Sequence, residues 1–227
     1  MHRGLRLSLV IPCYNEEDGI EQVLRRVPRD VDETIVVDNA STDATAERAR
    51  AGGARVVAES RRGYGAAYKA GLAAAQGDVV ATLDGDGTYP PEHIPRLVDV
   101  LLDRQWDFLS ACRFPLTDPR AMSWTNRLGN AILSAETGLL FGYAIRDSQS
   151  GMWVFRRALL PRFHLTSDGM AFSEEIKLEA LLRGARFGED HVPYGVREGV
   201  VKLQRWRDGW ANLTFLVRKR LGWIDRW

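Results

Sequence analysis

Short apolar segments alternate with helical segments along the first half of the chain, and this alternation constrains the fold most strongly. Four segments are rich in apolar and β-branched residues, namely 7–11, 33–38, 54–58 and 78–83. Between them, apolar residues recur at helical spacing, as in 16–27 and 66–75. Continuous apolar strands that alternate with helices predict an α/β fold, in which helices cover both faces of a mostly parallel sheet.

The carboxyl ends of the predicted strands carry polar clusters. These are the segment 12–16, Asp38, the glycine-containing loop 61–65, and the pair Asp84 and Asp86. In open parallel sheets, ligands bind beyond the carboxyl ends of the strands. The sequence therefore predicts one functional site at this edge.

The second half of the chain continues as less regular α/β structure. Helices are expected at 92–103, 124–140 and 172–183, and strands at 108–112 and 152–155. No internal repeat or low-complexity linker divides the sequence. We therefore expect a single domain over 1–227, in which 206–227 forms a basic, aromatic helical tail.

Composition narrows the possible partners and the compartment. A hydrophobic content of 45% is typical of a globular protein, and a formal net charge of +1 argues against nucleic acid as a partner. The two cysteines, Cys13 and Cys112, provide neither a disulfide framework nor a metal-binding spacing. Because we find no secretory signal and no run of ~20 apolar residues, we expect a cytoplasmic protein that is soluble or peripheral on the cytoplasmic face of the membrane.

Two carboxylates, Asp84 and Asp86, follow a predicted strand and are separated only by Gly85. Their like charges repel when both are ionised, and a divalent cation removes that cost. Oxygen ligands suit Mg²⁺ or Mn²⁺, and Mg²⁺ bound by one or two carboxylates usually completes its shell with water and substrate phosphates. The pair predicts a metal and a diphosphate-containing substrate. The alternative is a polar turn that only ends the strand.

Three segments together resemble the nucleotide-binding segments of family-2 inverting glycosyltransferases, which have the Rossmann-like GT-A fold. They are 12–16, 36–43 and Asp84-Gly85-Asp86. The resemblance implies nucleotide-sugar contacts from Pro12, Tyr14, Glu16, Asp38, Asp84 and Gly85, and metal contacts from Asp84 and Asp86. The chain departs from the family at Asn39, where a second aspartate is frequent. It also departs at Thr88, where Gln or a similar ligand is common, so Thr88 would reach the metal through water.

Four later segments follow the order seen in polyprenyl-phosphate sugar synthases of the dolichol-phosphate mannosyltransferase type. They are 111–113, 126–130, 147–151 and 197–203. The resemblance implies that Arg113 and Arg127 grip the acceptor phosphate, since guanidinium groups match phosphate oxygens. It also implies that Arg197 and Lys202 lie over the donor diphosphate, from a loop in which Val201 replaces a frequent serine.

Three further features each allow two interpretations. The loop 61–65 could approach the nucleotide closely or be a flexible turn, and it lacks the GxGxxG pattern of a dinucleotide site. Glu174 and Glu175 complement the dipole of a helix start, although Glu175 could be a general base. The tail suits an anionic membrane surface, or it packs as a helix with a solvated basic face; its tryptophans are Trp206, Trp210, Trp223 and Trp227.

These observations predict a metal-dependent transferase. The donor would be a nucleoside-diphosphate sugar of the GDP-mannose or UDP-glucose type, and a polyprenyl or dolichyl phosphate would accept the hexose with inversion. The metal held by Asp84 and Asp86, together with Arg197 and Lys202, would neutralise the charge that grows on the leaving diphosphate. One alternative is transfer to a hydroxyl of a lipid, metabolite or glycan precursor, with Glu175 as the base. The other is a non-catalytic nucleotide-sugar or nucleic-acid-binding module.

Overall fold

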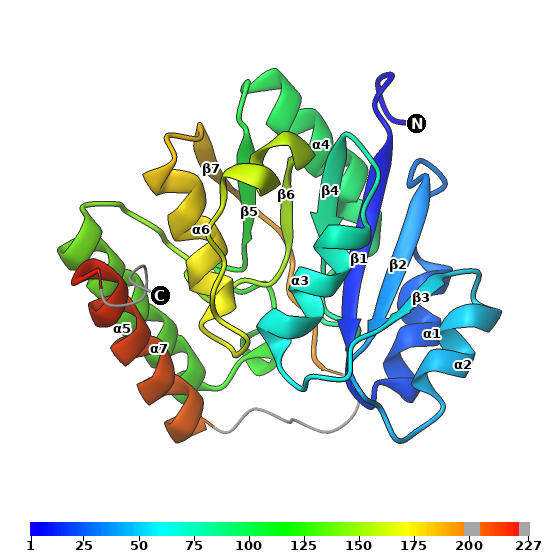
Figure 1. Cartoon of the computed structure of the whole chain (residues 1–227), viewed down its shortest axis with the longest axis horizontal. Coiled ribbons are helices and arrows are strands. Elements are labelled where there is room, and N and C mark those ends of the chain that lie inside the picture. The colour runs from blue at the N-terminus through cyan, green and yellow to red at the C-terminus, as the bar shows by residue number, and fades with distance from the viewer. Residues whose placement is uncertain (198–204, 223–227) are drawn as a thin grey trace.

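One seven-stranded sheet forms the centre of the computed structural model, which describes residues 1–197 and 205–222 (Figure 1). Its strands are β1 (Leu7–Cys13), β2 (Glu33–Asp38), β3 (Arg55–Ala58), β4 (Val79–Thr82), β5 (Phe108–Cys112), β6 (Trp153–Arg156) and β7 (Phe187–His191). The strand order is β3-β2-β1-β4-β6-β5-β7. Only β6 runs antiparallel to its neighbours, β4 and β5. The predicted mostly parallel sheet is therefore confirmed.

Seven α-helices of the described residues surround the sheet. They are α1 (Glu17–Arg25), α2 (Thr45–Ala51), α3 (Tyr64–Ala74), α4 (Ile94–Asp103), α5 (Trp124–Phe141), α6 (Phe172–Leu182) and α7 (Arg205–Arg220). Three short 3₁₀ helices lie at Pro91–His93, Pro119–Ala121 and Arg157–Arg162. Among the described residues, no helix is both long enough and apolar enough to cross a membrane.

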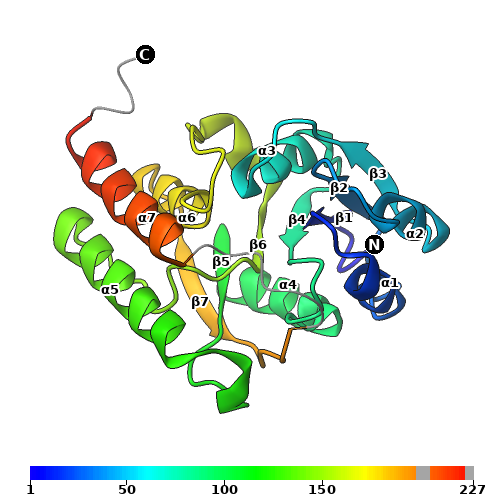
Figure 2. The same ribbon diagram turned by 90° about the horizontal axis from the view of Figure 1, so that it is seen from below.

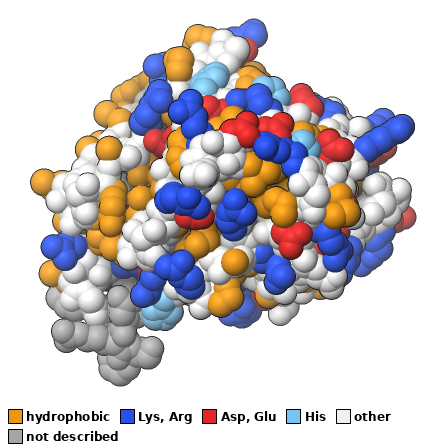
Figure 3. Space-filling view, turned by 90° about the horizontal axis from the view of Figure 1, so that it is seen from above, with side chains coloured by type: hydrophobic (Ala, Val, Ile, Leu, Met, Phe, Trp, Pro, Cys, Tyr) orange, Lys and Arg blue, Asp and Glu red, His pale blue; other side chains and the backbone are white. Residues whose placement is uncertain are grey.

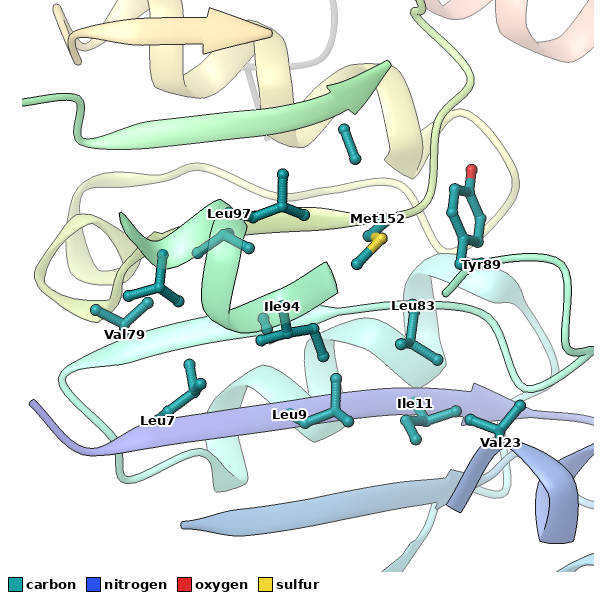
Figure 4. Packing of buried hydrophobic residues seen from close by; sticks show 14 of the residues in the cluster. Leu7, Leu9, Ile11, Val23, Val79, Leu83, Tyr89, Ile94, Leu97 and Met152 are labelled. Atoms are coloured by element: carbon teal, nitrogen blue, oxygen red, sulfur yellow. The ribbon is translucent and has the colours of Figure 1, made fainter. Parts of the chain in front are cut away.

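Each face of the sheet has its own hydrophobic cluster. On one face, α1, α2 and α4 pack through residues such as Val23, Ile94 and Leu97 against Leu9 and Ile11 of β1 (Figure 4). The opposite face is covered by α3 and α6, which contribute Tyr68, Leu72, Phe172 and Ile176. The alternation of strand residues between two clusters explains why the strands of the first half are apolar throughout.

Helices α5 and α7 lie side by side and form an outer layer beyond α6 (Figures 1 and 2). Leu133 of α5, Leu178 of α6 and Leu216 of α7 make a third, smaller cluster. Helix α7 covers most of the described part of 206–227, the segment for which the sequence predicts a helical tail. The inner face of α7 packs against the domain. This packing agrees with the interpretation of the tail as a packed helix with a solvated basic face.

The sequence did not predict β7, nor the antiparallel direction of β6. The residues of β7, Phe-Gly-Glu-Asp-His, bury only Gly188 fully, so this edge strand carries little hydrophobic signal. It pairs with β5 in parallel register from Phe187 to His191. Strand β6 is reached from β5 through the long excursion that contains α5, and no local pattern encodes its direction.

Helix α3 lies unusually close to the sheet at Gly71. A Cβ atom at Gly71 would lie 2.4 Å from Val10 Cγ1 and 2.8 Å from Val37 Cγ2, both on neighbouring strands. Gly71→Ala should therefore lower the free energy of unfolding by about 1–3 kcal/mol through overpacking. Urea denaturation measures the change.

Gly129 in α5 is the matched control, because a Cβ atom there would have no neighbour within 4 Å. Gly129→Ala should leave stability unchanged or raise it by up to about 1 kcal/mol, since alanine favours helix. Equal effects of the two substitutions would contradict the close approach of α3 to the sheet.

Candidate active site

The acidic segment after β4 is pressed against the end of β1. A Cβ atom at Gly85 would lie 2.5 Å from Cys13 Sγ, and one at Gly19 of α1 would lie 2.7 Å from the carbonyl oxygen of Gly85. Only residues without side chains fit at these two contacts. Asp84 and Asp86 are thereby fixed at the carboxyl edge of the sheet, where the sequence predicted the site.

Two tyrosine hydroxyl groups hold Asp84. Its Oδ1 accepts hydrogen bonds from the hydroxyl groups of Tyr64, at 3.2 Å, and Tyr68, at 3.4 Å. Gly151 lies against the same carboxylate, because a Cβ atom there would come within 2.9 Å of Asp84 Oδ2. Desolvation, followed by the charge of Asp86, raises the pKa of Asp84 to about 7. Burial and the neighbouring charge thus disfavour the ionised form of Asp84.

Asp86 is buried and bridges two parts of the chain. Its Oδ1 accepts hydrogen bonds from the backbone N–H and the hydroxyl group of Thr88, at 3.1 and 2.6 Å. Its Oδ2 accepts from Arg197 Nη1 at 2.7 Å, while Arg197 Nη2 donates to Glu16 Oε1 at 2.5 Å. One guanidinium group therefore spans the acidic segment and the end of β1. Its Nε is buried without a hydrogen-bond partner among the described residues.

These side chains surround a cavity of about 350 Å³. Its lining includes Pro12, Tyr14, Glu16, Asn39, Arg62, Gly63, Tyr64, Asp84, Gly85, Asp86, Met170 and Arg197. In the segments 12–16 and 84–88, seven residues are predicted to contact the nucleotide sugar or the metal. Six of these seven line the cavity. Thr88 is the exception, because its hydroxyl group points at Asp86 and it does not line the cavity.

The glycines of the loop 61–65 lie close to the backbone of residues 167 and 168. A Cβ atom at Gly63 would lie 2.1 Å from the carbonyl oxygen of Asp168, and Gly65 N and Ala66 N donate to that oxygen at 2.9 and 3.2 Å. The first amide groups of α3 are therefore already used. Gly63 still lines the cavity, but these amides do not form a phosphate cradle.

Asn39 and Arg62 are cavity residues that the sequence did not assign to a function. Asn39 accepts from Gly63 N at 2.8 Å and donates to the carbonyl oxygens of Glu59 and Arg61, so it holds the loop in place. The guanidinium carbon of Arg62 lies 4.6 Å from the centre of the Tyr14 ring. Neither segment alone predicts this stacking of a cation on an aromatic ring at the cavity wall, because 48 positions separate Tyr14 from Arg62 in the sequence.

A second polar group, around the loop 147–151, lies behind the cavity. Buried Arg113 donates to both carboxylate oxygens of Asp147, from Nε at 2.8 Å and from Nη2 at 2.7 Å. Buried Lys177 of α6 donates to the carbonyl oxygens of Asp147 and Ser148, at 3.0 and 2.6 Å. Burial lowers the pKa of Lys177 to about 8. Arg113 is close enough to Asp84 for its charge to lower the pKa of that carboxylate.

Three other predicted site residues of the described part of the chain do not line the cavity. Asp38 lies at the end of β2, where its Oδ1 accepts from Ser41 N at 3.0 Å. Arg127 lies on the exposed surface of α5. Buried Glu175 accepts hydrogen bonds from Thr166 N, Thr166 Oγ1 and Ser167 N, at 2.9, 2.8 and 2.9 Å, so its carboxylate anchors a loop and is not placed as a general base. Lys202, with Val201, lies outside the described residues.

The donor set at the acidic segment fits a hard divalent cation. Asp84 and Asp86 offer oxygen ligands only, and their unequal compensation by tyrosines and arginine leaves charge for a cation to neutralise. Within residues 1–197 and 205–222, no group of three or more histidine, cysteine or acidic side chains could hold a metal ion by itself. A cation here would take its remaining ligands from water and substrate phosphates.

A mostly parallel sheet with an acidic cavity at the carboxyl ends of its strands is the arrangement of a nucleotide-binding α/β enzyme. Comparison with known families then identifies the group. The chain belongs to glycosyl transferase family 2, whose model matches residues 8–163. The predicted family, and with it the prediction of a glycosyltransferase, is confirmed.

Relatives of known name extend the comparison. The chain is 35% identical over 215 residues to a dolichyl-phosphate hexose transferase of Haloferax volcanii, with 93% of this chain and 92% of that protein covered. It is 30% identical to the low-salt glycan biosynthesis hexosyltransferase Agl6 of the same organism, but it spans only 54% of that protein's length.

A solved structure of glucosyl-3-phosphoglycerate synthase from Mycobacterium tuberculosis matches with a TM-score of 0.76 and 27% identity, covering 96% of this chain and 81% of that one. That structure contains Mn²⁺, uridine diphosphate and glucosyl-3-phosphoglycerate. The likeness, which covers 96% of this chain, confirms the expected fold class.

Glu174, beside Lys177 in α6, predicts a pH dependence of stability. Burial raises the pKa of Glu174 to about 8, against a smaller opposing effect of Lys177. The folded state therefore retains a proton between about pH 4.5 and pH 8 that the unfolded chain releases, and the free energy of unfolding falls as the pH rises through that window. Glu174→Gln cannot ionise, so its decrease should be smaller than that of the wild type by about 1 kcal/mol or more.

Urea denaturation at both ends of this window measures the effect. Glu47→Gln is the control, because Glu47 is an exposed acid on α2 and its removal should leave the pH dependence as in the wild type. If Glu174→Gln and the wild type lost the same stability over the window, the buried ionisation would not exist.

Proposed function

We propose that this chain transfers a hexose from a nucleoside-diphosphate sugar to a polyprenyl phosphate, with inversion and with Mg²⁺ or Mn²⁺ bound. The observation that carries the proposal is the Arg197 bridge between Asp86 and Glu16 in the acidic cavity. The carboxylates of Asp84 and Asp86 line that cavity together with Arg197, whose Nε has no partner among the described residues. A diphosphate supplies oxygens for both.

Different described residues would bind different parts of the donor. Tyr14, with Arg62 stacked on its ring, provides a flat wall for the base. Asp84 and Asp86 would hold the cation, which when bound neutralises charge on the diphosphate. Arg197 would turn from Asp86 to a phosphate oxygen once the cation compensates that carboxylate. The negative charge that develops on the leaving diphosphate would then be stabilised by positive charge that is already in place.

For the acceptor, a phosphate fits the cavity region better than a hydroxyl group does. A phosphate oxygen is already ionised and needs no base. Among the described residues, the carboxylates that line the cavity are Glu16, Asp84 and Asp86, and each has a place on the donor side. Arg113 uses Nε and Nη2 on Asp147, which leaves Nη1 for an acceptor oxygen. The relative named for dolichyl phosphate supports this choice, and such an acceptor would bring the chain to a membrane surface.

A second candidate acceptor is a small phosphorylated hydroxy acid. The solved neighbour is a glucosyl-3-phosphoglycerate synthase that superposes over almost the whole chain. In that case the phosphate would only position the molecule, and a hydroxyl group would attack. Arg113 would serve either acceptor, so the product has to decide.

The acceptor panel is the test of the proposed reaction. Labelled GDP-mannose and UDP-glucose are each incubated with a polyprenyl phosphate, the matching polyprenol and 3-phosphoglycerate. We expect a chloroform-soluble, acid-labile product from the polyprenyl phosphate alone, because only this acceptor needs no base. Label on 3-phosphoglycerate would establish the second candidate, and label on the polyprenol would overturn the phosphate acceptor.

Asp86→Asn tests the cation. The substitution keeps the shape of Asp86 but removes its charge, so Mn²⁺-dependent turnover should fall about 100-fold or more. The thermal shift that Mn²⁺ adds to nucleoside diphosphate should also disappear. Asp78→Asn changes an exposed aspartate at the opposite end of the same strand and should leave both measurements unaltered. Wild-type turnover in Asp86→Asn would remove Asp86 from the mechanism.

A further inference from the structure

Large hydrophobic side chains are exposed mainly on the outer helices, α5 and α7. Of the ten exposed large hydrophobic side chains among the described residues, six lie on these helices and a seventh directly follows α7: Trp124, Leu128, Ile132, Leu139, Trp210, Val217 and Leu221. Leu139 is 86% exposed, Trp124 72% and Trp210 70%. Figure 3 shows hydrophobic side chains along the edge of the molecule that corresponds to the α5 and α7 side of Figure 1.

On each helix these residues form a stripe. In α5 they are spaced by four, four and seven positions, which places them on one face, opposite the buried face of Leu133 and Thr137. In α7 the spacings are seven and four, away from buried Asn212 and Leu216. Both helices therefore have an inner face that packs on the domain and an apolar outer face that no described residue covers.

The charges near the stripes are positive. Arg127 of α5 and Arg218 and Arg220 of α7 are exposed. Among the described side chains of the two helices, the only carboxylate is Glu136, which is partly buried. Tryptophan rings beside arginines on an amphipathic helix suit the headgroup region of an anionic bilayer, where the apolar face enters the acyl boundary.

We propose that α5 and α7 together form a docking surface for an anionic membrane leaflet, with both helices lying in the plane of the interface. The excess of arginine over exposed acid favours phospholipid headgroups as the partner. This surface extends beyond the C-terminal tail, because α5 carries four of the seven exposed side chains. The inference rests on the proposed function only in that a polyprenyl phosphate is found in a bilayer.

Vesicle flotation tests the surface without donor or acceptor. The full chain is mixed with vesicles of phosphatidylcholine alone or with roughly one third phosphatidylglycerol. The wild type should float with the anionic vesicles only, and added salt should weaken binding. In Trp124→Asp/Leu139→Asp, two well-exposed side chains change, so the fold should persist while the ratio of bound to free protein falls about tenfold or more.

Leu182→Asp is the control, since Leu182 of α6 is also an exposed large hydrophobic residue, at 46%, but lies outside both stripes. It should float like the wild type. Thermal unfolding verifies that each variant is folded. Flotation of the double variant at the wild-type level would overturn the proposal, as would failure of the wild type to float. If the wild type were a dimer and only the double variant were monomeric, the stripes would be an interface between two copies of the chain. That result would also overturn the proposal.

The outcome is separable from that of the proposed function. Binding to vesicles needs no turnover, so a lack of product in the acceptor panel would leave flotation unchanged. Conversely, a chain that does not float but still glycosylates a detergent-solubilised polyprenyl phosphate would retain its function and lose this surface.

Discussion

The mutual repulsion of Asp84 and Asp86 is the constraint on which the rest of the site depends. The chain compensates it unequally, with tyrosine hydroxyl groups on Asp84 and with Thr88 and Arg197 on Asp86. This compensation requires three segments, distant in sequence, to meet at one sheet edge. The glycine at position 85 permits the approach, because any side chain there would collide with Cys13. The negative charge that remains uncompensated can be neutralised by a divalent cation that also binds a diphosphate.

The support for this edge comes from buried charged groups as well as from apolar packing. Lys177 holds the carbonyl oxygens of the loop 147–151, and Asp147 in that loop fixes Arg113. Buried ion pairs contribute little net stability, but they define one arrangement, since each partner left alone would be a buried charge. We infer that the second half of the fold accepts the electrostatic cost of these buried charges and thereby positions Arg113.

The sequence predicted the first half of the site well because the chemistry there follows directly from strand ends. Asp84 and Asp86 end a strand whose apolar residues are unambiguous, and the parallel topology brings the other strand ends beside them. Glu175 could not be assigned in the same way. Its place at a helix start suits catalysis or capping equally, and only the tertiary contacts with Thr166 and Ser167 show which way the carboxylate points. Strand β7 was missed because an edge strand can be polar.

The outer helices and the site share buried side chains. Asn212 of α7 donates to Gln149 in the loop 147–151, and Lys219 of α7 lies 2.8 Å from Glu179 and 3.5 Å from Glu175 of α6. The helix that carries part of the apolar stripe thus also anchors the loop that fixes Arg113. If the stripe rests on a leaflet, as we propose, α7 would couple that leaflet to the loop that positions Arg113, the proposed acceptor residue.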